Sequence, residues 1–218
     1  MSFRYRDRRE AGDKLSEKLR EMRATNAVVL GIPRGGVVVA ARVAEKLHLP
    51  LDIIIPRKIG APFNPELAIG AVMQDGTVLL NESVVKHYSL RKEEISKLAD
   101  QQIDEIKRRM IKYRGSDRYP NYAGKNIILV DDGIATGFTV RAAVKYIRNT
   151  FQPRQIILAV PVAPPDTMEM LSREVEKVAC PLMPEIFYAV GQFYEKFEQT
   201  TDEEVISLLH KKGQKEKY

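Results

Sequence analysis

The segment that most constrains the fold is NIILVDDGIATGFT, in which an apolar run is followed directly by two carboxylates and a Gly/Thr turn. Ile127 to Val130 are continuously apolar and mostly β-branched, as expected of a central parallel strand that is covered on both faces. The turn is therefore predicted to lie between the carboxyl end of a buried strand and the amino end of a helix. The apolar residues of that helix recur at helical spacing, namely Val140, Ala143, Val144 and Ile147.

The turn offers two kinds of contact to a ligand. Backbone N–H groups at the start of the helix and the hydroxyls of Thr136 and Thr139 favour a bound phosphate, and the glycines let the main chain approach it. Asp131 and Asp132 would repel that anion, but carboxylates accept hydrogen bonds from hydroxyl groups and ligate hard cations. The pattern therefore predicts a ligand that carries phosphate together with sugar hydroxyls or a magnesium ion.

The string from Ile127 to Thr139 resembles the phosphoribosyl diphosphate (PRPP) signature of the type I phosphoribosyltransferases. The resemblance implies that Asp131 and Asp132 hold the ribose hydroxyls and are catalytic residues. One position departs from the family pattern, because Gly133 stands where an apolar residue is more usual, and we interpret it as a looser turn. The resemblance also implies a 5′-phosphate site formed by Ala135, Thr136, Gly137, Phe138 and Thr139.

Strands alternate with helices along the chain, which predicts an α/β fold with a doubly wound, mostly parallel sheet and helices on both faces. The resemblance implies the same type I phosphoribosyltransferase fold. A chain of 218 residues is expected to form a single domain over 1–218. By resemblance it carries a small hood formed mainly by about 181–218, with a contribution from the N-terminus left open. Further strands are predicted over 27–30, 52–56, 71–73, 78–80, 155–162 and 175–180, and further helices over 11–22, 37–47, 90–114 and 166–173 and after Thr201.

Two other loops follow predicted strands and should reach the same edge of the sheet, where ligands of such folds bind. Arg57 and Lys58 resemble the basic pair that opens the flexible catalytic loop of the family, which implies a catalytic role for both. The Gly- and Pro-punctuated segment 59–77 is the candidate for that flexible loop, as a lid that excludes water. The first loop resembles the diphosphate-binding loop, which often contains a cis peptide and comprises here Pro33, Arg34, Gly35 and Gly36.

The resemblance implies a magnesium-dependent glycosyltransferase that transfers the phosphoribosyl group of PRPP to a nitrogen nucleophile and releases diphosphate, as in nucleotide salvage. A nucleobase is the expected acceptor. Tyr188 to Glu195 are similar to the hood of hypoxanthine-guanine phosphoribosyltransferases, which nominates Tyr188 for stacking on the base and Glu195 for approach to Mg²⁺. An aromatic-rich segment is also typical of a hydrophobic core that has no role in binding. Those enzymes carry a catalytic acid where this chain has Ala135 and a lysine about where it has Val162, which argues against a six-oxopurine acceptor. Another purine, a pyrimidine or a non-nucleobase amine remains open as the acceptor.

The formal net charge of +6 admits nucleic acid as a partner, but an anionic small ligand explains it equally well. Much of the basic excess lies at 1–9 and 211–217, where solvated termini are the simpler interpretation. The alternative function is a PRPP-sensing, RNA-binding regulator without significant turnover, and the basic helix segment 107–109 could then contact RNA. We expect no nucleic-acid partner, because a solvated helix face accounts for that segment.

No apolar stretch approaches the roughly 20 residues that a membrane helix requires, so no membrane association is expected. The single cysteine, Cys180, cannot form an internal disulfide, which fits a cytoplasmic protein. A homodimer is expected because it is the commonest soluble oligomer.

Overall fold

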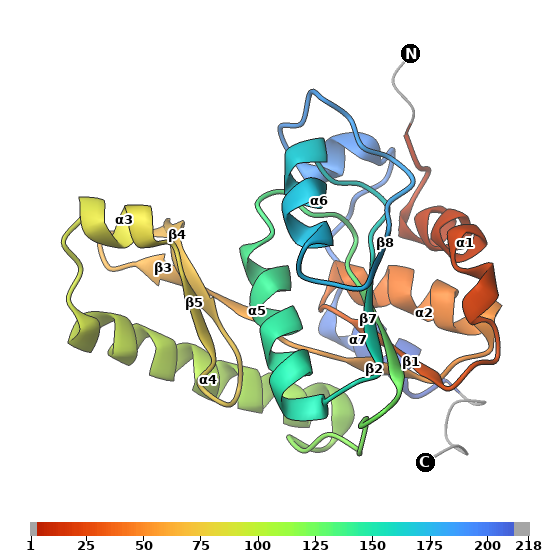
Figure 1. Cartoon of the computed structure of the whole chain (residues 1–218), viewed down its shortest axis with the longest axis horizontal. Coiled ribbons are helices and arrows are strands. Elements are labelled where there is room, and N and C mark those ends of the chain that lie inside the picture. The colour runs from red at the N-terminus through yellow and green to blue at the C-terminus, as the bar shows by residue number, and fades with distance from the viewer. Residues whose placement is uncertain (1–3, 212–218) are drawn as a thin grey trace. The chain divides into compact units, whose positions relative to one another are not determined.

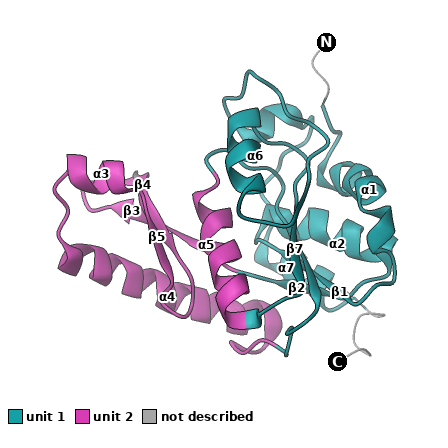
Figure 2. Ribbon diagram, in the orientation of Figure 1, with its two compact units in different colours: residues 1–54, 120–136, 151–218 teal, residues 55–119, 137–150 magenta. Residues whose placement is uncertain are grey.

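The computed structural model describes residues 4–211 (Figure 1). The chain divides into two compact units (Figure 2). Unit 1 comprises the described residues of 1–54, 120–136 and 151–218, and unit 2 comprises 55–119 and 137–150. Residues 181–211, expected to form the hood, therefore belong to the same unit as the N-terminal segment, whereas two separate segments, 55–119 and 137–150, form the second unit.

Unit 1 is built on a five-stranded sheet in which every neighbouring pair is parallel, as predicted. The central strand β6 and its neighbour β1 are buried along their whole length, which explains their continuous apolar sequence. Gly31 at the end of β1 is in register with Val130 at the end of β6, so the loops that follow them leave from neighbouring points. In spatial order the strands are β2 (Leu51–Ile53), β1 (Ala27–Gly31), β6 (Asn126–Val130), β7 (Gln155–Ala159) and β8 (Lys177–Ala179).

Helices α1 (Arg8–Lys18) and α2 (Gly35–Leu47) pack on each other and on one face of this sheet. Their apolar residues share one core with the strands, including Leu15 of α1, Val43 of α2 and Ile128 of β6. The opening amphipathic helix is thereby confirmed, although its last turn is the separate 3-10 turn η1 (Arg20–Met22). The other helical elements of unit 1 are α6 (Pro165–Ser172), η3 (Val190–Phe193) and α7 (Asp202–Leu209).

Unit 2 contains a three-stranded antiparallel sheet in the order β3 (Arg57–Ala61), β4 (Asn64–Val72) and β5 (Val78–Leu80). The predicted hairpin is confirmed by the pairing of β4 with β5. The prediction of a loop over 59–77 is wrong as secondary structure, because most of the segment is strand, and Ile59, Ile69 and Val72 are fully buried. Its glycines and prolines mark an irregular antiparallel pair, since the register shifts on either side of Gly60.

Helices complete unit 2. The predicted long helix is α4 (Lys92–Arg114), which buries Ile95, Ile106 and Tyr113, whereas the short α3 (Glu82–His87) was not predicted. The remaining helical elements are α5 (Phe138–Tyr146) and the π-turn η2 (Ile147–Phe151), whose last residue belongs to unit 1. None of the helices in residues 4–211 is long and apolar enough to cross a membrane.

The basic segment of α4 is largely paired within its own helix. Glu105 accepts hydrogen bonds from Arg108 Nε at 2.6 Å and from Arg109 Nε at 2.6 Å. These contacts lower the pKa of Glu105 to about 2, so its charge offsets that of its neighbours at neutral pH. A solvated helix face stays our interpretation of this segment, and no contact of the described residues tests RNA binding.

Candidate functional site

Asp131 and Asp132 directly follow β6, and both are half-buried. The backbone N–H of Asp132 donates to Asp131 Oδ1 at 2.8 Å, which ties the two residues together. Burial, and then the neighbouring carboxylate of Asp132, raise the pKa of Asp131 well above its usual range. The pair therefore resists carrying two full negative charges unless a cation or hydrogen-bond donors approach it.

Arg8 supplies one such cation. Its Nε donates to Asp132 Oδ2 at 2.7 Å, and its Nη1 donates to the carbonyl oxygen of Glu198 at 2.7 Å. The guanidinium also lies over the ring of Phe197, 3.9 Å from the centroid. Because the Arg8 side chain is only 12% exposed, the prediction of a solvated terminus is wrong for this residue. Residues 212–217 of the predicted basic tail lie outside the described part of the chain.

Tyr194 holds the acid pair from another side. Its hydroxyl donates to the backbone carbonyl of Asp132 at 2.5 Å, and its ring contacts Tyr5 with centroids 5.5 Å apart. Burial raises the pKa of Tyr194 above its ordinary value, so the phenol stays protonated and can donate. Part of the aromatic segment thus belongs to the hydrophobic core, because Phe193 and Tyr194 are buried. The Tyr194 hydroxyl nevertheless supports the residue that carries the second carboxylate.

The predicted diphosphate loop lies against the acid pair. It connects β1 to α2, and its Pro33–Arg34 peptide bond is cis. A side chain at Gly35 would overlap the Asp132 carboxylate, and a Cβ at Gly36 would lie 2.7 Å from Asp131 Oδ1. Two motifs about a hundred residues apart in sequence are therefore brought together, as the parallel-sheet argument predicts.

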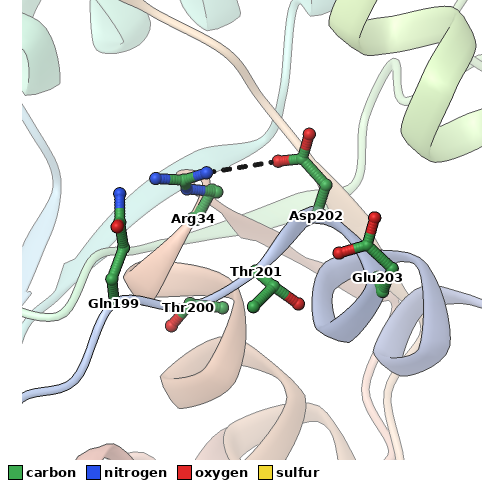
Figure 3. A pocket seen from close by; sticks show the side chains of 6 residues that line it. All are labelled: Arg34, Gln199, Thr200, Thr201, Asp202 and Glu203. Carbon is green, nitrogen blue, oxygen red and sulfur yellow. Dashed lines mark hydrogen bonds and ion pairs between the residues drawn. The ribbon is translucent and has the colours of Figure 1, made fainter.

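Arg34 of this loop points toward the start of α7. Its Nη1 lies 3.5 Å from Asp202 Oδ1 (Figure 3). Thr201 caps α7 by accepting a hydrogen bond from the backbone N–H of Glu204 at 3.1 Å, which confirms the predicted helix start. An anion that binds Arg34 would have to compete with Asp202. A cavity of about 210 Å³ is lined here by Arg34, Gln199, Thr200, Thr201, Asp202 and Glu203.

The predicted 5′-phosphate turn leads into the N-terminus of α5, as expected. Ala135 and Thr136 are exposed, and the Ala135 carbonyl accepts a hydrogen bond from the Thr167 hydroxyl at 2.8 Å. Gly137 precedes the first residue of the helix with a φ of 78°, a conformation that favours glycine. The chain passes from unit 1 to unit 2 at this glycine. Phosphate binding by Ala135 to Thr139 stays a prediction.

Gly133 is explained by packing and not by a looser turn. The residue is buried, and a Cβ there would lie 2.5 Å from Val190 Cγ1 and 3.1 Å from Val162 Cγ1. Any larger residue would collide with the segment that carries Tyr194, so the departure from the family pattern matches a close approach of η3.

Replacing Gly133 with alanine should therefore lower the free energy of unfolding by about 1–3 kcal/mol, the usual cost of overpacking. Urea unfolding would measure the change. Adding Val190→Ala should restore part of the lost stability, because it removes the methyl groups in closest contact. If the double variant were less stable than Gly133→Ala by the full cost of Val190→Ala alone, this explanation would be wrong.

Arg57 and Lys58 lie in strand β3 of unit 2 and do not begin a loop. Arg57 donates to Gln102 Oε1 from Nε at 3.0 Å and from Nη2 at 2.8 Å, while Lys58 is exposed. Burial, and then the nearby Arg109, lower the pKa of Arg57. Their approach to the acid pair stays a prediction.

Tyr188 and Glu195 are both at the surface of unit 1. Tyr188 is 87% exposed, so it is not part of the core. Glu195 is exposed, and its backbone N–H donates to the Tyr5 carbonyl at 2.8 Å. Within residues 4–211, no group of three or more His, Cys, Asp or Glu side chains is placed to hold a metal ion. The stacking and metal roles stay predictions.

Sequence reasoning missed Arg8 and Tyr194 as parts of this site. Arg8 belongs to no motif and stands in a basic N-terminal run, so only its three-dimensional contacts identify it. Tyr194 stood within the segment similar to a hood, but the residue nominated there was Tyr188. The alternation of tyrosine and phenylalanine in that segment gave no signal for a hydrogen bond to the residue after β6.

The chain is similar to known proteins of one family. A family model described as the phosphoribosyl transferase domain matches residues 6–198. A Mycobacterium tuberculosis H37Rv protein provisionally named a phosphoribosyl transferase is 41% identical over 206 residues, which cover 94% of this chain and 46% of the relative. The chain thus spans about half the length of the curated relatives it matches. A bifunctional protein pyrR of Enterococcus faecalis V583 is 29% identical over 133 residues, 61% of this chain and 54% of that protein.

A solved structure also resembles this chain over most of its length. The crystal structure of TT1426 from Thermus thermophilus is 39% identical to it, with a TM-score of 0.79. The match covers 95% of this chain and 98% of that one, so the α/β fold described above is shared over nearly the full length of both.

Proposed function

Because the chain belongs to the phosphoribosyl transferase domain family, we propose that it transfers the phosphoribosyl group of PRPP to a nitrogen nucleophile and releases diphosphate. The observation that carries the proposal is the packing of Gly35 and Gly36 against Asp131 and Asp132. It supports the proposal because a loop suited to diphosphate and carboxylates suited to ribose hydroxyls then border one site.

The acid pair would hold the ribose. The carboxylates of Asp131 and Asp132 accept hydrogen bonds from the two hydroxyls, while the turn from Ala135 to Thr139 donates to the 5′-phosphate. Held at both ends, the sugar presents its anomeric carbon in a fixed orientation, which lowers the entropic cost of reaching the transition state.

The loop from Pro33 to Gly36 would take the diphosphate. The guanidinium of Arg34 is a forked donor that suits phosphate oxygens, and it would exchange Asp202 for the ligand. In this proposal Arg57 and Lys58 add positive charge. The segment 59–77 serves as the lid. The bond between the anomeric carbon and diphosphate then breaks as the acceptor nitrogen bonds to that carbon, so no protein nucleophile is needed.

Magnesium fits this site as an ion that PRPP brings with it. Mg²⁺ in such sites is held by one or two carboxylates together with phosphate oxygens, and Asp131 and Asp132 provide a matching pair. When bound, the ion would supply positive charge that stabilises the leaving diphosphate.

A nucleobase is the acceptor that we propose, with the exposed ring of Tyr188 available for stacking and Glu195 for approach to Mg²⁺. A homodimeric, cytoplasmic enzyme of nucleotide salvage completes the proposal. The experiment that tests it is incubation with PRPP, Mg²⁺ and a panel of purines, pyrimidines and other amines while diphosphate release is followed. Absence of both turnover and calorimetric binding of Mg²⁺–PRPP would overturn the proposal.

Replacing Lys58 with alanine is expected to lower turnover about 10- to 100-fold, the effect of losing one charge-assisted hydrogen bond to the diphosphate. Thermal unfolding should change little, because Lys58 is exposed and the contacts of exposed charges contribute little to stability. Lys86→Ala is the matched control, since Lys86 is also an exposed lysine of unit 2 but lies on α3. Equal turnover in both variants would remove Lys58 from the proposed site.

A further inference from the structure

Residues 5–6, near the start of the described chain, are joined to residues 193–196 beside the acid pair, and we call these contacts the clasp. Tyr5 N–H donates to the Phe193 carbonyl at 2.8 Å, Glu195 N–H donates to the Tyr5 carbonyl at 2.8 Å, and Lys196 N–H donates to the Arg6 carbonyl at 2.9 Å. The Tyr5 hydroxyl donates to the Pro161 carbonyl at 3.0 Å and anchors the segment to unit 1. The backbone that leads into α1 is therefore fixed.

Arg8 is the first residue of α1, and its position is set by this clasp. Asp7 caps the helix by accepting hydrogen bonds from the backbone N–H groups of Arg9 and Glu10, both at 2.9 Å. From there the Arg8 side chain reaches Asp132, while the Glu198 carbonyl and the Phe197 ring hold the other parts of its guanidinium. A Cβ at Gly35 would come within 2.6 Å of Arg8 Nε, so the cation also borders the diphosphate loop.

Stability alone is a poor reason for this arrangement. The side chains of Arg8 and Asp132 are 12% and 16% exposed, and removing a charge pair from water costs much of what their attraction returns. The pair has a clear use, however, next to a ligand with several negative charges. It offsets the repulsion between Asp132 and that ligand, and it confines the Asp132 carboxylate to one orientation.

Resting on the function proposed above, we propose that Arg8 is a positioning residue for PRPP, which acts by fixing Asp132. In this arrangement Asp132 Oδ2 is engaged by Arg8, and Oδ1 accepts a hydrogen bond from a ribose hydroxyl. The contacts of Arg8 with Glu198 and Phe197 make the position of Asp132 depend on the C-terminal segment. Arg8 itself touches neither the reacting bond nor the acceptor.

Calorimetric titration of the full chain with Mg²⁺–PRPP tests the proposal. Arg8→Gln should weaken binding at least about tenfold, the effect of one charge-assisted contact. Arg8→Lys should recover only part of the loss, because an ammonium cannot contact Asp132 and Glu198 as a planar fork does. Arg9→Gln is the matched control, since it removes the same charge from the adjacent, exposed residue and should bind within about twofold of wild type.

A double-mutant cycle with Asp132→Asn separates positioning from a purely structural role. If Arg8 acts through Asp132, adding Arg8→Gln to Asp132→Asn should change the affinity by less than about twofold. If Arg8→Gln does not fold, Phe197→Leu tests the same positioning role. It keeps the Arg8 cation but removes the aromatic ring that the guanidinium lies over, and it should weaken PRPP binding several-fold.

The outcomes are distinct. If wild type does not bind Mg²⁺–PRPP, the proposed function fails, and the role of Arg8 fails with it. If wild type binds and Arg8→Gln binds equally well, or if the effects of Arg8→Gln and Asp132→Asn simply add, only the positioning role is overturned. Wild-type affinity in Phe197→Leu, when Arg8→Gln does not fold, overturns it in the same way.

Discussion

Replacing Asp132 with asparagine is expected to lower PRPP turnover about 100- to 1,000-fold, the range found when one preorganised group that stabilises a transition state is removed. The amide lacks the charge that accepts a ribose hydroxyl strongly, and it has only one oxygen, so it cannot accept from Arg8 and from the ribose at separate oxygens. Diphosphate release with PRPP, Mg²⁺ and the acceptor found in the panel would measure the loss.

The fold should survive this change. The hydrogen bond from Tyr194 goes to the backbone carbonyl of Asp132, and asparagine keeps that carbonyl. Asp117→Asn is the matched control, because Asp117 is exposed and lies in unit 2. Full activity in Asp132→Asn, with unfolding like that of wild type, would refute the assignment of the acid pair.

Gly35→Ala should weaken Mg²⁺–PRPP binding at least about 100-fold and lower the free energy of unfolding by about 1–3 kcal/mol, the usual cost of overpacking. The added methyl group would overlap the Asp132 carboxylate and crowd Arg8 Nε. Neither neighbour can move aside easily, because Arg8 is held by Glu198 and Phe197. Calorimetry and urea unfolding would measure the two effects.

A control must separate lost binding from lost stability. Gly115→Ala serves this purpose, because Gly115 ends α4 with a φ of 75° and a Cβ there would meet no other atom within 4 Å. Alanine in that conformation should cost about 1 kcal/mol of stability and leave PRPP binding unchanged. Wild-type affinity in Gly35→Ala would mean that the loop and the acid pair do not share a ligand.

The strand, turn and helix around Asp131 were predictable because their signals are local. A continuous apolar run, an abrupt change to polar residues and a return of apolar residues at helical spacing are all visible within about twenty residues of sequence. The approach of the loop at Gly35 was also predictable, since parallel strands expose their carboxyl ends at one edge. The loop and the acid pair meet because β1 and β6 are neighbours in the sheet.

Other parts of the molecule depend on contacts that no local pattern announces. The prediction for 59–77 took Gly60 and Pro65 as signs of a loop, whereas a Cβ at Gly60 would collide with the Pro65 backbone of the adjoining strand. Gly133 likewise reflects the nearness of Val190 and not the shape of its own turn. The contact between Arg8 and Asp132 joins residues 124 positions apart, which periodicity and motif spacing cannot detect.

The clasp also affects when the site can form during translation. Arg8 and Asp132 are translated well before Glu198, whose carbonyl oxygen holds the guanidinium. At about 5–20 residues per second, several seconds separate the synthesis of the acid pair from that of its last support. A nascent chain that extends past β8 but stops before Glu198 has all five parallel strands without the carbonyl that holds Arg8, so it should bind the sugar diphosphate more weakly than the chain of 218 residues.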